Sequence, residues 1–216
     1  SPPSPPSPPN LPPLAIDTAP SGRYSSNVEG SSDTRRRLLL AAERLAGREG
    51  VARLTLEAVA AEAGVSKGGL LYHFSGKEEL IGAMVMRWVE DFERDVESRL
   101  AREGPRAGRW VRAYVGATFE PEAGSGPAAG EPVSVLAAAA TNQELLGELR
   151  RCYRKWQERM EDDGLDPALA TLLRLAADGL WFSELFGLAP PSGRLRERVH
   201  RRMLELASGG CGGRKP

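Results

Sequence analysis

Apolar residues recur at intervals of three and four positions along most of the chain between residues 34 and 207. This spacing places them on one face of a helix. The longest stripe occupies every fourth position and consists of Leu80, Met84, Trp88, Phe92, Val96 and Leu100. No segment alternates apolar and polar residues over several positions, as a half-buried strand would. The sequence therefore predicts an all-α fold of about nine helices.

Residues suited to begin and end helices stand at the borders of the apolar stripes. Thr55 and Ser66 each precede such a stripe, and their hydroxyl groups can accept a hydrogen bond from the first helical turn. Gly64, between them, can adopt the left-handed conformation that ends a helix. These signals predict three short helices at about 34–74, followed by a larger helical body that ends near residue 207.

The two ends of the chain differ from this helical part. Nine of the 17 prolines lie in the first twenty residues, which predicts an extended tail of polyproline type. We expect residues 1–32 and 208–216 to be disordered, and the domains to span 33–79 and 80–207. The sequence contains no basic and apolar secretory leader and no apolar stretch of membrane length, so a cytoplasmic protein without a membrane partner is predicted.

The charge balance and the scarcity of histidine exclude some functions. The chain carries 29 basic and 29 acidic residues, so it does not hold nucleic acid by bulk charge, although a local basic surface is possible. His73 and His200 are its only histidines, and the sequence shows neither a glycine-rich phosphate loop nor a metal-binding cluster. We therefore expect no enzyme activity, no cofactor and no metal site.

Residues 55–74, TLEAVAAEAGVSKGGLLYHF, carry the strongest functional signal. A helix of about eight residues ends at a glycine, and a second short helix begins at a serine after a short turn. This is the helix-turn-helix arrangement, in which the second helix enters the major groove of DNA. Tyr72 and His73, with Lys67 and Lys77 at either end, suit phosphate contact. Double-stranded DNA is therefore the predicted partner.

The longer string LTLEAVAAEAGVSKGGLLYHFSGKEEL, preceded by three arginines at 35–37, resembles the N-terminal signature of the TetR family of bacterial transcriptional repressors. The resemblance covers about residues 33–85. It implies a homodimeric repressor that leaves a pseudo-palindromic operator when a small effector binds. The positions that it implies for DNA contact are Thr55, Ser66, Lys67, Gly68, Leu71, Tyr72, His73 and Lys77. Many relatives carry an aromatic residue in place of Leu71, and a leucine there can contact a thymine methyl group but cannot donate a hydrogen bond.

The last two predicted helices, at about 167–187 and 194–207, carry apolar stripes that admit two interpretations. In the TetR family the corresponding helices of two subunits form a four-helix bundle, so the stripes can be a dimer interface. They can also be the core of a single subunit. We favour the interface, because helices at the end of a chain have few neighbours to cover them. Its predicted residues are Leu172, Leu173, Leu180, Leu195, Val199 and Met203.

Aromatic residues concentrate in the middle of the body, where small residues are also frequent. Aromatic walls separated by small side chains can enclose a ligand, although an ordinary core is the simpler interpretation of any one ring. The predicted effector pocket consists of Trp110, Tyr114, Tyr153, Trp156, Trp181 and Phe182. It would receive a small effector that is partly apolar or aromatic. The alternative is an architectural DNA-binding protein that has the same helix-turn-helix and needs no effector.

Overall fold

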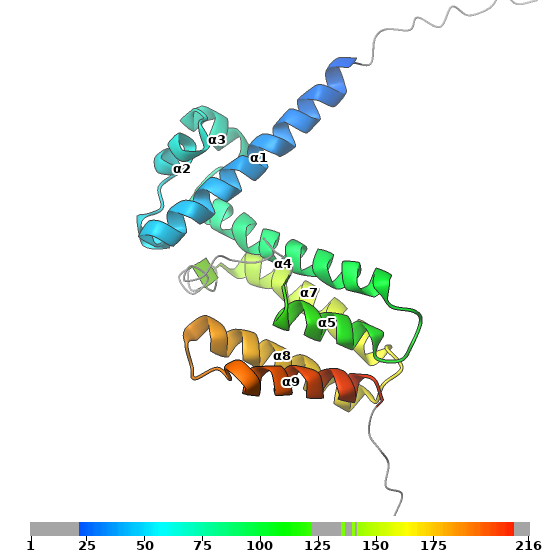
Figure 1. The fold of residues 1–216 in the computed structure, drawn as a ribbon. Coiled ribbons are helices and arrows are strands. Elements are labelled where there is room, and N and C mark those ends of the chain that lie inside the picture. The colour runs from blue at the N-terminus through cyan, green and yellow to red at the C-terminus, as the bar shows by residue number, and fades with distance from the viewer. Residues whose placement is uncertain (1–21, 122–134, 137–139, 141, 210–216) are drawn as a thin grey trace, which may run out of the picture. The chain divides into compact units, whose positions relative to one another are not determined.

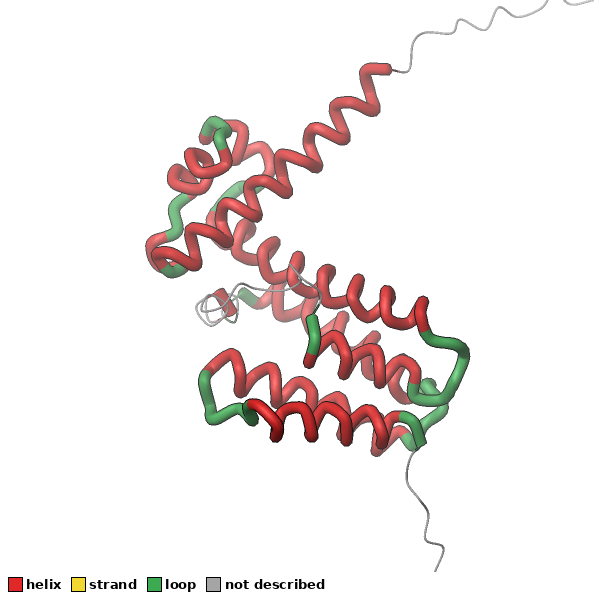
Figure 2. The backbone as a smooth tube through the Cα atoms, viewed as in Figure 1, coloured by secondary structure: helices red, strands yellow, loops and turns green. Residues whose placement is uncertain are grey.

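The computed structural model describes residues 22–121, 135–136, 140 and 142–209. Helices joined by short loops account for these residues, and no strand occurs among them (Figure 2). The helices are α1 (Gly22–Glu49), the short 3-10 helix η1 (Val51–Arg53), α2 (Leu56–Ala63), α3 (Lys67–His73), α4 (Lys77–Arg102), α5 (Arg109–Phe119), α7 (Gln143–Glu161), α8 (Pro167–Phe186) and α9 (Gly193–Ala207) (Figure 1). The predicted all-α fold is confirmed. None of the described helices is both long and apolar enough to cross a membrane.

The first helix begins earlier than the sequence analysis expects. Helix α1 starts at Gly22, so residues 22–32 are helical rather than part of a disordered tail. No proline follows Pro20 until Pro105, so nothing in this stretch prevents helical hydrogen bonding. The rest of the two predicted tails, residues 1–21 and 210–216, lies outside the described residues. Residues up to Thr34 form a separate unit, and the contacts below belong to the unit that begins at Arg35.

The predicted caps of α2 and α3 are confirmed. The Thr55 hydroxyl accepts a hydrogen bond from the backbone N–H of Ala58 at 3.2 Å, and the Ser66 hydroxyl accepts one from Gly69 at 3.0 Å. Gly64 ends α2 with a φ of 66°, in the left-handed region that favours glycine. These three residues fix where α2 stops and where α3 starts, and so they set the angle at which α3 is presented.

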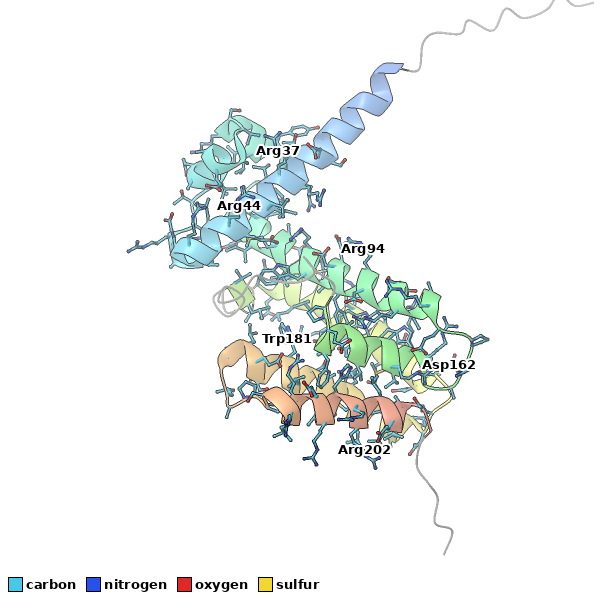
Figure 3. All side chains as sticks on the ribbon, viewed as in Figure 1. Arg37, Arg44, Arg94, Asp162, Trp181 and Arg202 are labelled. Atoms are coloured by element: carbon cyan, nitrogen blue, oxygen red, sulfur yellow. The ribbon has the colours of Figure 1, made fainter. Side chains whose placement is uncertain are left out.

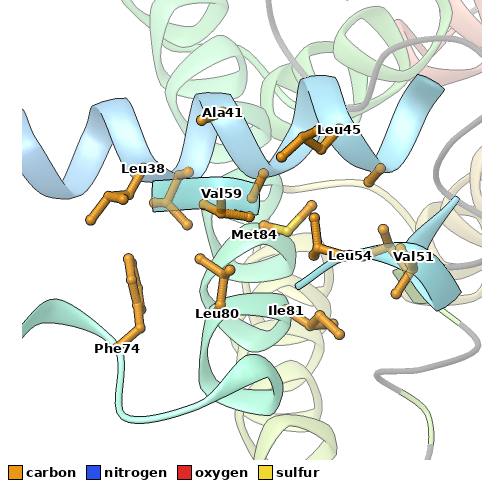
Figure 4. Packing of buried hydrophobic residues seen from close by; sticks show 14 of the residues in the cluster. Leu38, Ala41, Leu45, Val51, Leu54, Val59, Phe74, Leu80, Ile81 and Met84 are labelled. Atoms are coloured by element: carbon orange, nitrogen blue, oxygen red, sulfur yellow. The ribbon is translucent and has the colours of Figure 1, made fainter. Parts of the chain in front are cut away.

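Two hydrophobic clusters form the interior, and α4 contributes to both. The first, which we call the head core, joins α1, α2 and α3 to the N-terminal half of α4 and also takes in Leu145 at the start of α7. It includes Leu38, Val59, Leu70, Phe74, Leu80 and Met84 (Figure 4). The second, the body core, joins the C-terminal half of α4 to α5, α7, α8 and α9. Asp91 and Asp95 lie on α4 between the two clusters, and they are the two buried charged side chains among the described residues.

Candidate functional site

Helix α3 is held in place by its buried side and by arginines of α1. Leu70 and Phe74 are almost completely buried in the head core. The Arg35 guanidinium lies over the Phe74 ring, 5.2 Å from its centroid, and Arg37 donates a hydrogen bond to the carbonyl oxygen of Ala63 at 2.7 Å (Figure 3). These arginines therefore brace α2 and α3 against α1.

The opposite side of α3 is open to solvent and carries most of the predicted DNA contacts. Tyr72 is 81% exposed, the largest value among the exposed large apolar side chains. Its ring meets the half-buried ring of His73 edge to face, with 5.1 Å between the centroids. The remaining predicted positions on this helix and its cap are exposed as well, namely Ser66, Lys67, Gly68 and Leu71. The structure thus brings the α3 positions together on one short helix.

Both lysines that flank this surface already have partners. Lys67 forms an ion pair with Glu57 of α2 at 2.5 Å, and this contact lowers the pKa of the Glu57 carboxyl. Lys77, at the start of α4, donates a hydrogen bond to the carbonyl oxygen of Ala52 at 3.3 Å. The Lys67 pair is more than half exposed on both sides, and such surface pairs contribute little to stability. A phosphate can therefore replace Glu57 as the partner of Lys67 at small cost.

The glycine at position 68 is not explained by packing within the subunit. A Cβ atom added to Gly68 would have the Ser66 hydroxyl oxygen as its nearest neighbour, at 3.9 Å, which is ordinary contact. At Gly69 the same oxygen would lie at 3.3 Å, so there the capping side chain of Ser66 itself favours glycine. An exposed glycine that the subunit does not need is what a close approach by another molecule would require.

Four of the six predicted pocket residues form one aromatic cluster in the body. The Trp110 and Tyr114 centroids are 5.6 Å apart, those of Tyr114 and Trp156 are 5.9 Å apart, and those of Tyr153 and Trp156 are 4.9 Å apart. Phe92 of α4 joins them, 4.9 Å from Tyr114. Phe92 belongs to the long apolar stripe of α4, and no local pattern connects it with the predicted pocket, because the contact crosses between helices.

The other two predicted pocket residues have a different environment. Trp181 and Phe182, on α8, are both more than a third exposed (Figure 3). The Phe182 ring contacts Phe186, one turn further along α8, with 4.5 Å between the centroids. Neither residue takes part in the ring contacts of the described aromatic cluster. Within the described part of the chain, the predicted pocket is therefore divided between a ring cluster, of which Tyr153 is as exposed as Trp181, and a separate face of α8.

A polar network adjoins the aromatic cluster. The Tyr114 hydroxyl donates a hydrogen bond to Asp178 at 2.6 Å, and Arg174 pairs with the same carboxylate at 2.8 Å. Arg174 also donates to the side-chain oxygen of Gln157 at 2.7 Å. Burial raises the pKa of Asp178 and that of Tyr114, and it raises the pKa of Tyr153 to about 12. The network joins α5, α7 and α8 by contacts that are specific in direction.

The outer face of α8 is apolar and exposed. Leu172, Leu175, Gly179, Phe182 and Phe186 follow one another at intervals of three and four, so they lie on one side of the helix. The four with large side chains are all exposed, and Leu172 is the most exposed at 63%. An apolar helix face of this kind is usually covered by a partner. We call these five residues the α8 outer stripe.

Three of the predicted interface residues lie elsewhere and need correction. Leu173, Leu180 and Met203 are buried in the body core, whereas Leu172 and Leu195 are exposed and Val199 is half-buried. Neighbouring positions on a helix point about 100° apart, so Leu172 and Leu173 cannot serve the same surface. Leu175 and Phe186 were missed, because α8 is apolar on nearly all sides and its sequence does not distinguish the inner face from the outer one.

Two family models match most of the helical part of the chain. Residues 38–84 match the model described as "Bacterial regulatory proteins, tetR family", and residues 108–208 match "Tetracyclin repressor-like, C-terminal domain". The chain belongs to the TetR family of transcriptional regulators. The predicted family and its helix-turn-helix are confirmed.

Individual proteins that are similar to this chain include one curated regulator and several solved structures. The HTH-type transcriptional regulator TtgR of Pseudomonas putida is 42% identical over 57 residues, which cover 26% of this chain and 27% of that protein. The match thus spans about a quarter of the length of this curated relative. A transcriptional regulator from Rhodococcus sp. Rha1 is 23% identical with a TM-score of 0.61, and the match covers 82% of this chain and 96% of that one. The multidrug binding protein EbrR, solved in complex with ethidium, is 25% identical with a TM-score of 0.58, over 79% and 98% of the two chains.

Proposed function

We propose that this protein is a homodimeric transcriptional repressor that binds a pseudo-palindromic operator through α3 and is released from it by a small effector. One observation carries the proposal. Helix α3 presents the exposed Tyr72 and the unhindered Gly68 on a helix whose other side is locked by the buried Leu70 and Phe74. A rigid helix with an open, partly polar face is what groove recognition requires. The proposal places the protein in the cytoplasm with its DNA.

Charge placement, rather than total charge, would drive DNA binding. Residues 33–80 contain eight basic and seven acidic side chains, so this region has a net charge of only +1. Two copies would double the contacts and place two α3 helices in successive major grooves, about 34–36 Å apart. Affinity would then fall steeply with salt, because each phosphate contact releases counterions.

A second copy of the chain is the proposed occupant of the α8 outer stripe. Leu172, Leu175 and Phe182 are exposed there, and Leu195 of α9 is exposed as well. Helices α8 and α9 lie side by side in the ribbon and contact one another (Figure 1). Two such helix pairs can bury their apolar faces in a four-helix arrangement. This burial favours a two-fold dimer.

The aromatic cluster of the body is the proposed effector region. The relative EbrR is described as a multidrug binding protein and was solved with ethidium, which supports a flat, partly apolar effector for this chain too. Helix α4 contributes Phe92 to this cluster and Leu80 to the head core. An effector that shifts α4 would therefore disturb the support of α3. Coupling between two such sites is typically about 1–3 kcal/mol.

The DNA site is tested by fluorescence anisotropy on the promoter next to the coding sequence. We expect Tyr72→Ala combined with Lys77→Ala to weaken binding at least about tenfold, since charge-assisted contacts contribute about 1.5–3 kcal/mol each. The salt slope should also fall by about one unit for the lost lysine contact. Arg198→Ala is the matched control, because it removes one positive charge from an exposed position on α9. Full affinity in the double variant would refute the site.

An architectural DNA-binding protein that needs no effector is the second candidate. The observation that favours it is the close packing of the described aromatic rings, whose centroids lie 4.9–5.9 Å apart. Thermal stabilisation by small apolar compounds would decide between the two, because ligand binding to the folded state raises its stability. Stabilisation would favour the effector-controlled repressor.

A further inference from the structure

A cleft of about 180 Å³ lies where α4, α5 and α7 meet. Its apolar lining consists of two indole rings and one aliphatic side chain: Trp110, Trp156 and Val96. Its charged lining consists of two carboxylates from α4 and two cations from α7: Glu93, Glu97, Lys155 and Arg159. A small space bounded by both indoles and paired charges is unlike the rest of the body core, which is mainly apolar.

The charged residues form two ion pairs that join α7 to α4 beside the cleft. Lys155 pairs with Glu93 at 3.3 Å, and Arg159 pairs with Glu97 at 2.6 Å. The side chains of Lys155 and Arg159 are 54% and 43% exposed. Exposed pairs of this type contribute little to stability, so the two cations can turn out to solvent at little cost.

Glu93 is held more firmly than its basic partner. Its carboxylate also accepts a hydrogen bond from the indole N–H of Trp156 at 2.9 Å, and its side chain is only 33% exposed. A charge-assisted bond to a buried ring fixes the position of this carboxylate. The cleft therefore keeps a fixed negative group, while its positive groups are free to move.

An indole face beside this carboxylate is already used by a cation. The Arg159 guanidinium lies over the Trp110 ring, 6.0 Å from its centroid. This is near the outer limit for attraction between a cation and an aromatic ring, so the interaction is loose. The Trp110 N–H is buried and has no hydrogen-bond partner, so no hydrogen bond holds the edge of this ring.

We propose that this cleft binds a small organic ammonium ion, which takes the place of Lys155 and Arg159 beside Glu93 and the two indoles. A cationic ligand gains both the fixed carboxylate and the face of Trp110 that Arg159 now covers, and this combination suits a quaternary ammonium group. An anionic ligand would have to displace Glu93 from Trp156 and would face Glu97 as well. A neutral apolar ligand would gain nothing from either carboxylate.

The regulatory part of this inference rests on the proposed function. Occupation of the cleft breaks the two ion pairs between α4 and α7, and α4 continues to the head core. The ligand would thereby change the position of α4 relative to α7. The ammonium ion is thus the chemical class of effector that the cleft assigns to the proposed repressor.

Isothermal titration calorimetry on the DNA-free protein tests the site, with choline as the probe. Its neutral isostere, 3,3-dimethylbutan-1-ol, differs from it only in having carbon in place of the charged nitrogen. We expect choline to bind at least tenfold more tightly than the alcohol. Equal affinities for the two compounds would overturn the proposal.

Two variants test which residues act. Glu93→Gln keeps an oxygen for the Trp156 N–H but removes the charge, so choline should bind at least tenfold more weakly. Glu90→Gln, at an exposed position one turn earlier on the same helix, is the matched control. Arg159→Ala removes the competing guanidinium and should strengthen choline binding severalfold. Unchanged affinity in Glu93→Gln would contradict the assignment.

Operator release is measured separately from ligand binding. Choline should weaken operator binding by the intact protein, and the effect should disappear in Glu93→Gln. If choline binds in calorimetry and operator affinity stays the same, the effector role is refuted. If the protein binds choline and no operator at all, the proposed repressor function fails while the ammonium site stands.

Discussion

The head core and the body core differ in where they keep their distinctive chemistry. The head core is built mainly from aliphatic side chains such as Leu38, Val59 and Leu70, whereas Tyr72, the residue predicted to meet DNA, lies outside it and is exposed. The body core encloses aromatic rings, and Tyr114 sits inside it with a hydrogen bond to Asp178. If the proposed function holds, the residues that bind and the residues that stabilise are separate in the head and the same in the body.

The difference has a consequence for substitutions. A head residue can be changed on its outer face without disturbing the interior, because exposed side chains away from special contacts contribute little to stability. Truncating a body residue such as Tyr114 to alanine removes both a ring contact and a hydrogen bond. Substitutions in the head and in the body can therefore test the two sides of this contrast separately.

The largest effect is expected from truncating the head core. Leu70→Ala removes a side chain that is fully buried, which should lower the free energy of unfolding by about 2–5 kcal/mol. Tyr72→Ala, two positions away and 81% exposed, should change it by less than about 0.5 kcal/mol while weakening DNA binding. Urea unfolding measures the free energy of unfolding of both variants. A loss of more than about 2 kcal/mol in Tyr72→Ala would break the separation of function from stability in the head.

A smaller loss is expected in the body from removing one hydroxyl group. Tyr114→Phe deletes the donor that lies 2.6 Å from Asp178 and leaves that half-buried carboxylate with Arg174 alone. Removing one partner of a buried polar group costs about 1–3 kcal/mol, so unfolding should become easier by that amount. Tyr153→Phe is the control, because that hydroxyl is in a ring of the same cluster that is 37% exposed. Equal losses in the two variants would show that the Asp178 contact carries no special weight.

The same contrast explains what the sequence could and could not predict. The caps at Thr55 and Ser66 and the turn at Gly64 are local signals, so the position of α3 and the exposure of Tyr72 follow from a short string of residues. The Tyr114–Asp178 hydrogen bond joins residues 64 positions apart, and no local pattern indicates it. Such contacts depend on how helices are rotated against each other.

The rotation of α8 about its own axis also explains why part of the predicted interface was wrong. Leu172 and Leu173 are equally apolar and adjacent, yet one is exposed and the other buried. Because α8 is apolar on nearly all sides, its sequence does not indicate which of the two leucines faces the core. The sequence therefore predicted an interface on α8, but only the packing against α5 and α7 shows which face of the helix is left exposed.

A gain in stability is expected from filling the open space on α3. Gly68→Ala adds a methyl group that meets no close neighbour, and alanine favours a helix over glycine by up to about 1 kcal/mol. DNA affinity should fall all the same, because the new methyl group would obstruct close approach by DNA. Gly147→Ala on α7, whose nearest neighbour would be a flexible arginine at 3.8 Å, should be stabilised without loss of affinity. Unchanged affinity in Gly68→Ala would place the DNA backbone further away.

The smallest effect concerns a titratable ring inside the body. His200 stacks on Phe119 with 4.5 Å between the ring centroids, and its Nε2 atom is buried without a hydrogen-bond partner. Burial lowers the pKa of His200. Glu120 opposes this shift, and Arg196 and Arg99 add to it. Below the ordinary histidine pKa of about 6.5, the unfolded chain therefore takes up a proton that the folded protein resists.

Stability should consequently fall as the pH drops below about 6.5, and the loss should level off below the lowered pKa of the folded protein. His200→Gln should lack this part of the acid sensitivity, measured by urea unfolding between neutral pH and about pH 5. The raised pKa values of Asp178 and Asp163 act in the opposite direction, since a buried carboxylate is relieved by protonation, but they are common to both proteins and cancel in the difference. Arg201→Gln, at an exposed position on the same helix, is the control. If His200→Gln and the unaltered protein lose stability equally on acidification, the pH response belongs to a group other than His200.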